Sequence, residues 1–483
     1  MCSLEIIRDK IKGSVVLEQA YSVSRAVPAQ IYLVGGTVRD ILLGFYRGKD
    51  YDFVVKDDFE RTVEIFAKKV HGKIITWDCD QKRIVVRNKN GYDCIDFSRC
   101  KGKNIEEDLE RRDFTINAMA VDIKQLFSDV TLDIIDPLGA RDDISAKTIR
   151  ACSSTAFDED PLRILRAIRF ARQFGFAIDK QSRHMMHEKA AMIQHVSRER
   201  IKREMFTILH LPDACTSVKE LYGCSVFSFL IPAITHFMTV SQGAPHKDNV
   251  LKHAINTVMC VSMLLDHSAT LHGEYEQQID DYFNDIIEEG VSRRSLLIFT
   301  AFFHDSGKEA TRAYAGGKVT FHGHEREGAR INRSVAQSLG LGKRAQRIVQ
   351  QITENHMRIL QLSQLASITQ RAKMRLMRDI KGVSLEVAFL AIADVQATSD
   401  AASYEVTREN VTEVAQQIVA AVLSNQGGME CEQPVTGREV MEILHIPEGP
   451  EIGSLIAEIQ DRERSGLLQS KQEALSWIRQ KKT

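Results

Sequence analysis

The chain has 483 residues, with 64 Lys and Arg against 65 Asp and Glu and a formal net charge of −1. A net charge near zero argues against a protein that coats nucleic acid through bulk positive charge. Because 43% of the residues are hydrophobic, the composition also excludes an acidic, disordered tail protein. At about 150 residues per domain, the length suggests about three domains.

Neither a membrane span nor a disulfide framework is expected. The most apolar stretch, residues 225–240, contains Ser, Pro and His and is shorter than the ~20 residues that cross a bilayer. The first 20 residues are interrupted by charges and lack a signal-peptide core. The nine cysteines form no C-x-x-C pair, so we expect a reduced, cytoplasmic protein. The sequence indicates no obligate protein partner.

The charge is distributed unevenly along the chain. Residues 161–210 hold 11 basic and 4 acidic residues, and residues 291–390 hold 17 and 7. Residues 271–290 hold 7 acidic residues and none that is basic. A single charged run usually marks a solvated helix face. Because this chain has two basic tracts, binding of a polyanionic partner explains them as well as solvated helix faces do.

The order of strand and helix patterns predicts an α+β fold, with a small mixed-sheet head followed by an elongated all-α body. Short apolar strands are predicted at 31–34 and 51–55, and a hairpin at 83–98 turns through Asn and Gly. Residues 237–250 and 271–290 are candidates for linkers or insertions. Helical spacing of apolar residues occurs at 160–175, 197–210, 251–265, 293–304 and 343–359.

A predicted strand, a glycine pair and a helix start follow one another at residues 31–44. Gly35 and Gly36 would let backbone N–H groups approach a ligand closely, because neither residue has a side chain. The start of the next helix favours phosphate, and Arg39 adds a positive charge nearby. The same pattern also fits an ordinary tight turn.

Carboxylates cluster on the next predicted strands. On a strand, Asp50 and Asp52 would point to the same face and repel each other unless a cation lies between them. Two divalent metals held in this way support in-line phosphoryl transfer. A third carboxylate would come from a neighbouring strand, where Asp93 and Asp96 point to opposite faces. We favour Asp96, because both of its neighbours are apolar and would face the core.

Two further polar motifs lie at 111–122 and 157–176. From spacing alone, the polar residues of the first motif would lie on the surface around buried apolar neighbours. In the second motif, Asp160 would cap a helix, Pro161 suits its first turn, and Arg163 lies just inside it.

The motifs occur in the order seen in bacterial-type tRNA nucleotidyltransferases and poly(A) polymerases: GGTVRD, DYD, RRDFTINA, DPLGARDDI, EDPLR and SRERIKRE. Over residues 30–240 the chain therefore resembles the second class of this polymerase-β-like superfamily. The resemblance implies that Asp50 and Asp52 bind Mg²⁺, with Asp96 as the third catalytic carboxylate. It implies that the incoming nucleotide is bound by Gly35, Gly36, Arg39, Arg112, Asp113, Asn117, Asp160, Arg163 and Arg166.

The resemblance makes Asp160 and Arg163 the pair that reads the base, with Glu159 beside them. Cytosine and adenine each present an amine donor next to a ring nitrogen acceptor, and a carboxylate with a guanidinium complements both. Uracil and guanine reverse one or both groups, which would leave a buried partner unpaired. Such a site would accept CTP and ATP without a nucleic-acid template.

A second set of metal-ligand residues lies in the helical region. An adjacent His304-Asp305 pair within an apolar helix is costly to bury unless it is ligated or paired. Alone, this pair could instead be a helix terminus, and His253 a surface residue. With His253 and Asp394, the pair resembles the HD superfamily of metal-dependent phosphohydrolases. This resemblance implies that the four residues bind Ni²⁺, Co²⁺, Mn²⁺ or Mg²⁺. Further histidines that could line the same pocket are His322, His324 and His356.

The resemblance divides the chain into a nucleotidyltransferase head (1–150), a helical neck (151–236), an HD domain (237–405) and a C-terminal helical tail (406–483). It implies a CCA-adding enzyme that transfers CMP, CMP and AMP from CTP and ATP to the 3′ end of tRNA. An accessory phosphatase or 2′,3′-cyclic phosphodiesterase activity of the HD domain is also implied.

Alternatives share these motifs. CC-adding, A-adding and poly(A)-adding enzymes carry the same head, although poly(A) polymerases usually have a basic C-terminal extension and no HD domain. A phosphohydrolase with a nucleotide-sensing head is a further alternative.

Overall fold

The structure is a computed structural model of the whole chain, and it describes residues 13–481 apart from short gaps. The chain divides into two compact units, Met1–Ser197 with Cys224–Phe229, and Arg198–Gly223 with Leu230–Thr483. The four-domain division remains a prediction. The gaps are residues 47, 49, 89–90, 128–132, 233–248, 269–272, 316–317, 366, 399–403, 425–434, 448, 465–467 and 469–470.

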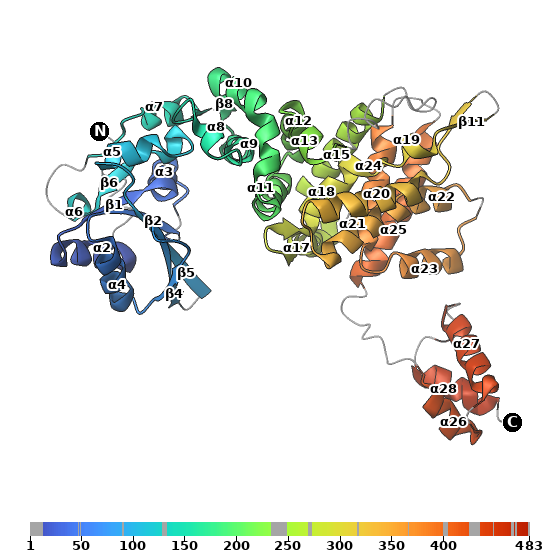
Figure 1. Ribbon diagram of the computed structural model, residues 1–483. Helices are drawn as coiled ribbons and strands as arrows, with labels where there is room; N and C mark the ends of the chain where they lie inside the picture. The colour runs from blue at the N-terminus through green and yellow to red at the C-terminus, as the bar shows by residue number, and fades with distance from the viewer. Residues whose placement is uncertain are drawn as a thin grey trace. The chain divides into compact units, whose positions relative to one another are not determined.

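The first unit is built on a six-stranded sheet with the strand order β3-β4-β5-β2-β1-β6 (Figure 1). β2 and β5 run parallel and the other neighbours run antiparallel, so the sheet is mixed as predicted. The predicted hairpin is formed by β4 and β5. The strands are β1 (Gln30–Val34), β2 (Tyr51–Lys56), β3 (Lys73–Thr76), β4 (Gln81–Asn88), β5 (Gly91–Arg99) and β6 (Ala120–Asp122).

The two faces of this sheet differ. One face packs against α2 (Val15–Ala26) and α4 (Phe59–Lys69) in the main core of the head, since alternate strand residues such as Phe53 and Phe97 are buried there. The opposite face carries a small apolar cluster that includes Val34 and Val54. Because side chains alternate along a strand, Asp52 and Asp96 belong to this second face.

Short helices and two short strands complete the first unit. The glycine pair opens α3, and the predicted helix at 160–175 is α9. The elements are α3 (Gly35–Leu43), α5 (Ile105–Glu110), η1 (Thr115–Asn117), α6 (Ile123–Leu126), α7 (Ala140–Ser145), β7 (Thr148–Ile149), α8 (Ala156–Glu159), α9 (Arg163–Phe174), β8 (Ala177–Ile178), α10 (Lys180–Lys189) and η2 (Ala190–His195).

The second unit is helical, as the spacing of apolar residues predicted (Figure 1). Its main helices are α11 (Arg198–His210), α12 (Ala214–Gly223), α15 (Val250–Asp266), α17 (Glu276–Asn284), α18 (Arg293–Phe303), α19 (Lys308–Thr311), α20 (His324–Ser338), α21 (Lys343–Asn355), α22 (Arg358–Ser363), α23 (Gln370–Asp379), α24 (Ser384–Ala397) and α25 (Glu405–Ser424). Shorter elements are η3 (Gly273–Tyr275), β9 (Ile286–Glu288), β10 (Val291–Ser292), β11 (Ala313–Ala315) and β12 (Lys318–Thr320). The short helix α13 (Val226–Leu230) belongs to the first unit except for its last residue.

One of the two candidates for a linker or insertion is not a linker. The acidic stretch 271–290 folds from residue 273 onward as η3, α17 and β9. Ile279 is fully buried and Phe283 nearly so, which anchors α17 in the body although its exposed face is acidic. The other linker candidate, 237–250, lies outside the described residues up to position 248, and its last two residues belong to the start of α15.

Three helices at the C-terminus share a small core of their own. They are α26 (Gly437–Leu444), α27 (Pro450–Arg464) and α28 (Lys471–Gln480), and they bury Val440, Ile459 and Ile478. Thr436 caps α26 in a reciprocal pair with Glu439. Within the described ranges, no helix is both long and apolar enough to cross a membrane.

Candidate active sites

Two carboxylates face each other across parallel strands of the head. In the pairing of β2 with β5, Asp52 lies directly opposite Asp96, so both side chains emerge on the same face. Asp93 is three residues earlier on β5 and points to the other face. The neighbours of Asp96, Ile95 and Phe97, are buried in the core as the choice of Asp96 required.

Asp50 differs from the expectation that it shares a strand with Asp52. It precedes β2, is exposed, and has a φ of +57°, a left-handed conformation outside the strand. Thr37 ties the two carboxylate residues together through the backbone. Its hydroxyl donates to the Asp50 carbonyl at 3.1 Å and accepts from the Asp52 N–H at 3.3 Å.

The electrostatics of Asp52 favour a cation. Loss of solvent raises the pKa of Asp52 to about 6, and the charge of Asp96 acts in the same direction. Arg112 and Arg39 lower it again without restoring the usual value. A divalent ion between the two carboxylates would relieve their repulsion, so the residues present fit a metal.

A cavity of about 990 Å³ lies against these carboxylates. Asp50 and Asp160 are not among the residues that line it. The glycine pair is needed here, because Gly35 has a φ of +64° and a Cβ at this position would lie 3.0 Å from Nη1 of Arg112. The lining includes Asp52, Asp96, Gly35, Gly36, Arg39, Arg112, Asp113, Asn117, Arg163 and Arg166.

Four predicted nucleotide-binding residues form one chain of hydrogen bonds. Arg166 donates through Nε and Nη2 to Oδ2 of Asp113, at 2.8 and 2.6 Å. Asn117 donates to the other oxygen of Asp113 at 3.0 Å and accepts from Nη1 of Arg39 at 2.5 Å. Burial would raise the pKa of Asp113, but Arg166, Asn117 and the Phe114 N–H lower it to about 2. These side chains are therefore fixed before any ligand binds.

The predicted base-reading pair occupies the start of α9. Asp160 accepts from the Leu162 N–H at 3.2 Å but does not cap α9 as predicted, because the N-cap position of α9 is Leu162 and no side chain caps it. Arg163 donates to the carbonyls of Arg111 and Ala156, at 2.9 and 3.1 Å. Arg163 is thus held in place at the cavity wall, whereas base reading by Asp160 remains a prediction.

Sequence reasoning missed Arg83, which belongs to the same site. Its Nε and Nη2 donate to the two oxygens of Asp96, each at 2.7 Å. The predicted hairpin could have indicated this contact, because the register that pairs Asn88 with Gly91 also pairs Arg83 with Asp96.

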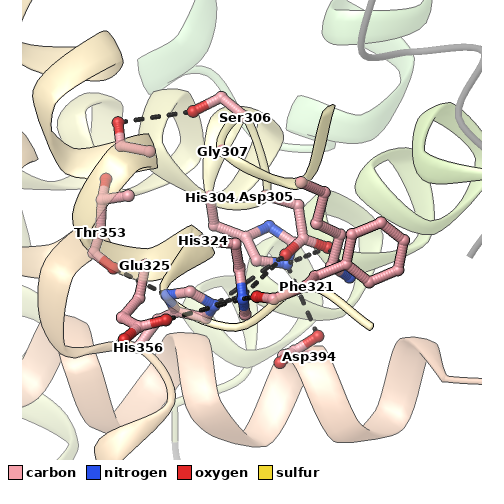
Figure 2. Close-up of polar contacts among 12 residues, drawn as sticks. His304, Asp305, Ser306, Gly307, Phe321, His324, Glu325, Thr353, His356 and Asp394 are labelled. Carbon is pink, nitrogen blue, oxygen red and sulfur yellow. Dashed lines mark hydrogen bonds and ion pairs between the residues drawn. The ribbon is translucent and has the colours of Figure 1, made fainter. Parts of the chain in front are cut away.

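The second site is a compact cluster in the helical unit, where Figure 2 shows the labelled side chains of His304, Asp305, His324, His356 and Asp394 gathered around one centre. His253 comes from α15 and Asp394 from α24, whereas His304 and Asp305 directly follow α18. Nε2 of His253 lies 2.9 Å from Asp394, and Nε2 of His304 lies 3.2 Å from Asp305. The structure therefore brings together all four predicted ligands.

Backbone hydrogen bonds orient three histidines of this cluster. Nδ1 of His304, His324 and His356 lies 2.8, 2.9 and 2.7 Å from the carbonyl three residues earlier. Because a carbonyl only accepts, each Nδ1 carries a proton, and in the neutral form of each ring Nε2 presents its lone pair. Nε2 of His304 is buried, and no atom of the described residues forms a hydrogen bond with it. These features fit a metal centre.

His324 and His356 join the cluster, but His322 is exposed. Asp305 faces both groups of histidines, since Oδ2 lies near His304 and Oδ1 lies 3.4 Å from Nε2 of His324. Lys308, which sequence reasoning missed, is buried with Nζ 2.6 Å from Oδ2 of Asp305. Its charge therefore compensates part of the carboxylate charge.

The charges of this cluster depend on one another. Burial would raise the pKa of Asp305, but His304 and Lys308 hold it well below its usual range. Burial would lower the pKa of His304, yet Asp305 and Asp394 raise it to about 10. The pKa of His356 falls to about 3, because burial and the neighbouring histidines disfavour its charged form.

Comparisons with known proteins match three models along the chain. Residues 31–150 match the poly(A) polymerase head domain, residues 175–238 a probable RNA- and SrmB-binding site of polymerase A, and residues 252–398 the HD domain. The chain belongs to the tRNA nucleotidyltransferase and poly(A) polymerase family. Its head and HD domains imply dependence on divalent metal.

Relatives of this family align along almost the whole chain. An A-adding tRNA nucleotidyltransferase of Deinococcus radiodurans is 25% identical, with 93% of this chain and 95% of the relative covered. A CC-adding tRNA nucleotidyltransferase of Geobacter sulfurreducens is 27% identical, with 93% and 91% covered. A solved CCA-adding enzyme with CTP has a TM-score of 0.65 at 19% identity and covers 99% and 97% of the two chains, which shows the same fold.

Gly35→Ala tests the nucleotide cradle. The new Cβ would crowd Arg112 and Asp52, so binding of CTP or ATP should weaken at least about tenfold. Gly44→Ala is the matched control, because Gly44 has a φ of +78° but no atom near its Cβ position. Calorimetric titration of both variants measures the effect, and equal weakening in the two would contradict the assigned cradle.

His304→Ala tests the metal centre of the helical unit. Loss of its Nε2 should lower the affinity for divalent metal at this centre at least about tenfold. His322→Ala removes a nearby but exposed imidazole and should retain the wild-type metal content. Metal analysis of the dialysed proteins provides the measurement, and identical contents in the two variants would exclude His304 as a ligand.

Proposed function

We propose that the protein adds CCA to the 3′ end of tRNA without a template, using CTP and ATP. The observation that carries this proposal is the opposition of Asp52 and Asp96 across parallel strands, beside a cavity that also holds the glycine pair and several arginines. Support comes from the tRNA nucleotidyltransferases that align along the chain. A cytoplasmic location follows from tRNA as the substrate.

The residues of the head divide the work of the transfer. Mg²⁺ bound at Asp50, Asp52 and Asp96 would activate the attacking hydroxyl and offset the phosphate charge. Gly35 and Gly36 let the backbone approach the triphosphate. The 3′ oxygen of the RNA forms a bond to the α-phosphorus, and the bond to the bridging oxygen breaks, so that pyrophosphate leaves.

Fixed arginines orient the incoming nucleotide. Arg39, Asn117, Asp113 and Arg166 are already hydrogen-bonded to one another, so they hold the ribose and phosphates without reorganising. Nη1 of Arg163 donates to the Ala156 carbonyl and to Glu159, whereas Nη2 uses one N–H on the Arg111 carbonyl and keeps its second N–H for the base. With Asp160, it selects cytosine and adenine over uracil and guanine.

The HD domain supplies a second, hydrolytic activity on phosphate esters, as a phosphatase or 2′,3′-cyclic phosphodiesterase. Its metal, which is Ni²⁺, Co²⁺, Mn²⁺ or Mg²⁺, is held by His253, His304, Asp305 and Asp394. This proposal is supported by His253, His304 and Asp394, whose ligand atoms lie within 4.8 Å of one another, and by Oδ2 of Asp305, which lies 3.2 Å from Nε2 of His304.

Partial addition is the second candidate function. The relatives that cover 93% of the chain are named as A-adding and CC-adding enzymes, including a CC-adding enzyme of Thermus thermophilus at 25% identity. Addition of CC alone or A alone would use the same carboxylates and the same cavity. Poly(A) addition and a nucleotide-sensing head remain as alternatives from the sequence.

The products distinguish these functions. The purified protein is offered a tRNA transcript that lacks CCA, a transcript that ends in CC, and an RNA that is not a tRNA, each with CTP, ATP or both. Extension of the first transcript by three nucleotides supports CCA addition. Extension by two or by one supports a partial enzyme, and long products on the third RNA would indicate poly(A) addition.

Asp52→Asn should reduce nucleotide addition at least about a thousandfold. Because the pKa of Asp52 is raised to about 6, its ionised form destabilises the metal-free fold at higher pH. The variant should therefore unfold at a higher temperature than wild type at pH 8, with the difference vanishing near pH 4. Lower stability of the variant at pH 8 would show that burial and the charge of Asp96 do not destabilise the ionised form of Asp52.

Asp305→Asn should have the opposite pattern, with nucleotide addition retained and metal-dependent phosphate-ester hydrolysis lost. The two variants are assayed side by side with the same tRNA and a generic phosphate ester. Loss of addition in Asp305→Asn would mean that the two sites do not act independently.

Arg163→Ala should relax the preference for CTP and ATP over UTP about tenfold or more, since one mispaired buried partner is worth about that factor. Arg169→Ala is the control, because Arg169 also lines the cavity and lies on the same helix. Competition between CTP and UTP on one transcript gives the ratio. An unchanged ratio in Arg163→Ala places base reading elsewhere.

A further inference from the structure

A row of side chains crosses the open face of the head sheet, beyond the residues assigned to the nucleotide. Asp52 on β2 is opposite Asp96 on β5, and Asp96 is opposite Arg83 on β4. Arg83 is opposite Ile75 on β3, and Trp77 lies just beyond the end of that strand with its ring against Arg83. The row therefore leads from the metal carboxylates to a tryptophan at the edge of the sheet.

Trp77 is exposed but held. It lines the head cavity, and 55% of its surface is open to solvent. The guanidinium of Arg83 lies 4.5 Å from the centre of its ring and is itself fixed by two hydrogen bonds to Asp96. A tryptophan that a cation fixes on one side, with much of its surface free, is a platform on which a nucleic-acid base can stack.

The geometry of the transfer places an RNA end at this platform. In an in-line displacement, the attacking and leaving groups lie on opposite sides of the phosphorus. The triphosphate loop with Gly35 and Arg39 follows β1, which adjoins β2 on the side away from β5. Pyrophosphate therefore leaves toward β1, and the attacking hydroxyl arrives from the side of β5, β4 and β3.

The charges around Trp77 favour a base over a phosphate. Lys82 is paired with Glu60, Arg99 with Asp80, and Arg83 with Asp96. These nearby cations are already compensated, so the main attraction that the platform offers is its aromatic surface. The incoming base is assigned instead to the start of α9, where Arg163 lines the same cavity.

We propose that Trp77 stacks on the 3′-terminal base of the acceptor RNA and that Arg83 positions it, which aligns the terminal hydroxyl with the metal carboxylates. This inference rests on the proposed nucleotide addition. It assigns an acceptor subsite to the β3–β4 edge of the sheet, formed by Trp77 with Arg83. Stacking tolerates any base, which suits an end that changes with each addition.

A base deletion in the RNA, combined with a variant of the protein, tests this subsite. Two tRNA transcripts that lack CCA are compared, one of them with an abasic 3′-terminal nucleotide. Wild type should use the abasic acceptor with a kcat/KM about tenfold lower, as expected for one lost stacking contact. Trp77→Ala should use both acceptors equally well, and Trp77→Phe should again discriminate between them.

Tyr92→Ala is the matched control, because Tyr92 is 66% exposed on β5 but does not line the cavity. It should discriminate as wild type does. Trp77→Ala that still discriminates tenfold would overturn the inference. Failure of wild type to extend either transcript would instead overturn the proposed function, so the two failures are distinct.

Fluorescence gives an independent readout. The chain has two tryptophans, so Trp477→Phe leaves Trp77 as the only reporter. The intact acceptor should quench its emission at saturation, and the abasic acceptor should quench it less. Quenching by CTP alone, without RNA, would assign the platform to the incoming nucleotide and overturn the inference.

Discussion

The parallel pairing of β2 with β5 is the constraint on which the head depends. It sets two carboxylates, Asp52 and Asp96, opposite each other on one face, while the alternate residues of both strands fill the core on the other face. The core thereby fixes the register, and a shift by one residue would bury both charges. Burial and the repulsion by Asp96 raise the pKa of Asp52, and the pair leaves a position that suits a divalent cation.

Both sites compensate buried charge locally. In the head, Arg166 and Asn117 hold Asp113 in its ionised form, and Arg83 neutralises Asp96. In the helical unit, Lys308 and His304 do the same for Asp305. The net charge of −1 carries little information about function, because charges cancel both within these sites and between the basic tracts at 161–210 and 291–390 and acidic stretches such as 271–290.

The sequence predicted those parts of the fold that follow from local rules. Strand alternation favoured Asp96 over Asp93, and the two glycines marked the close approach at α3. Asp50 was placed wrongly on the strand, because its left-handed backbone depends on contacts with Thr37 from another element. Tertiary packing likewise determines that the acidic stretch 271–290 contains a folded helix, because burial of Ile279 and Phe283 stabilises it despite the surrounding negative charge. The inclusion of His324 and His356 depended on how three helices converge, which periodicity does not describe.

Arg83 connects two parts of the head that the motifs treat separately. The same guanidinium binds both oxygens of Asp96 and packs on the ring of Trp77, so the carboxylate and the aromatic surface are fixed by one side chain. A metal ion bound at Asp96 would compete with Arg83 for the same oxygens, because a carboxylate has a limited number of lone pairs. Metal binding and the placement of Trp77 would therefore be coupled through Arg83, at the point where we propose that an acceptor end meets the carboxylates.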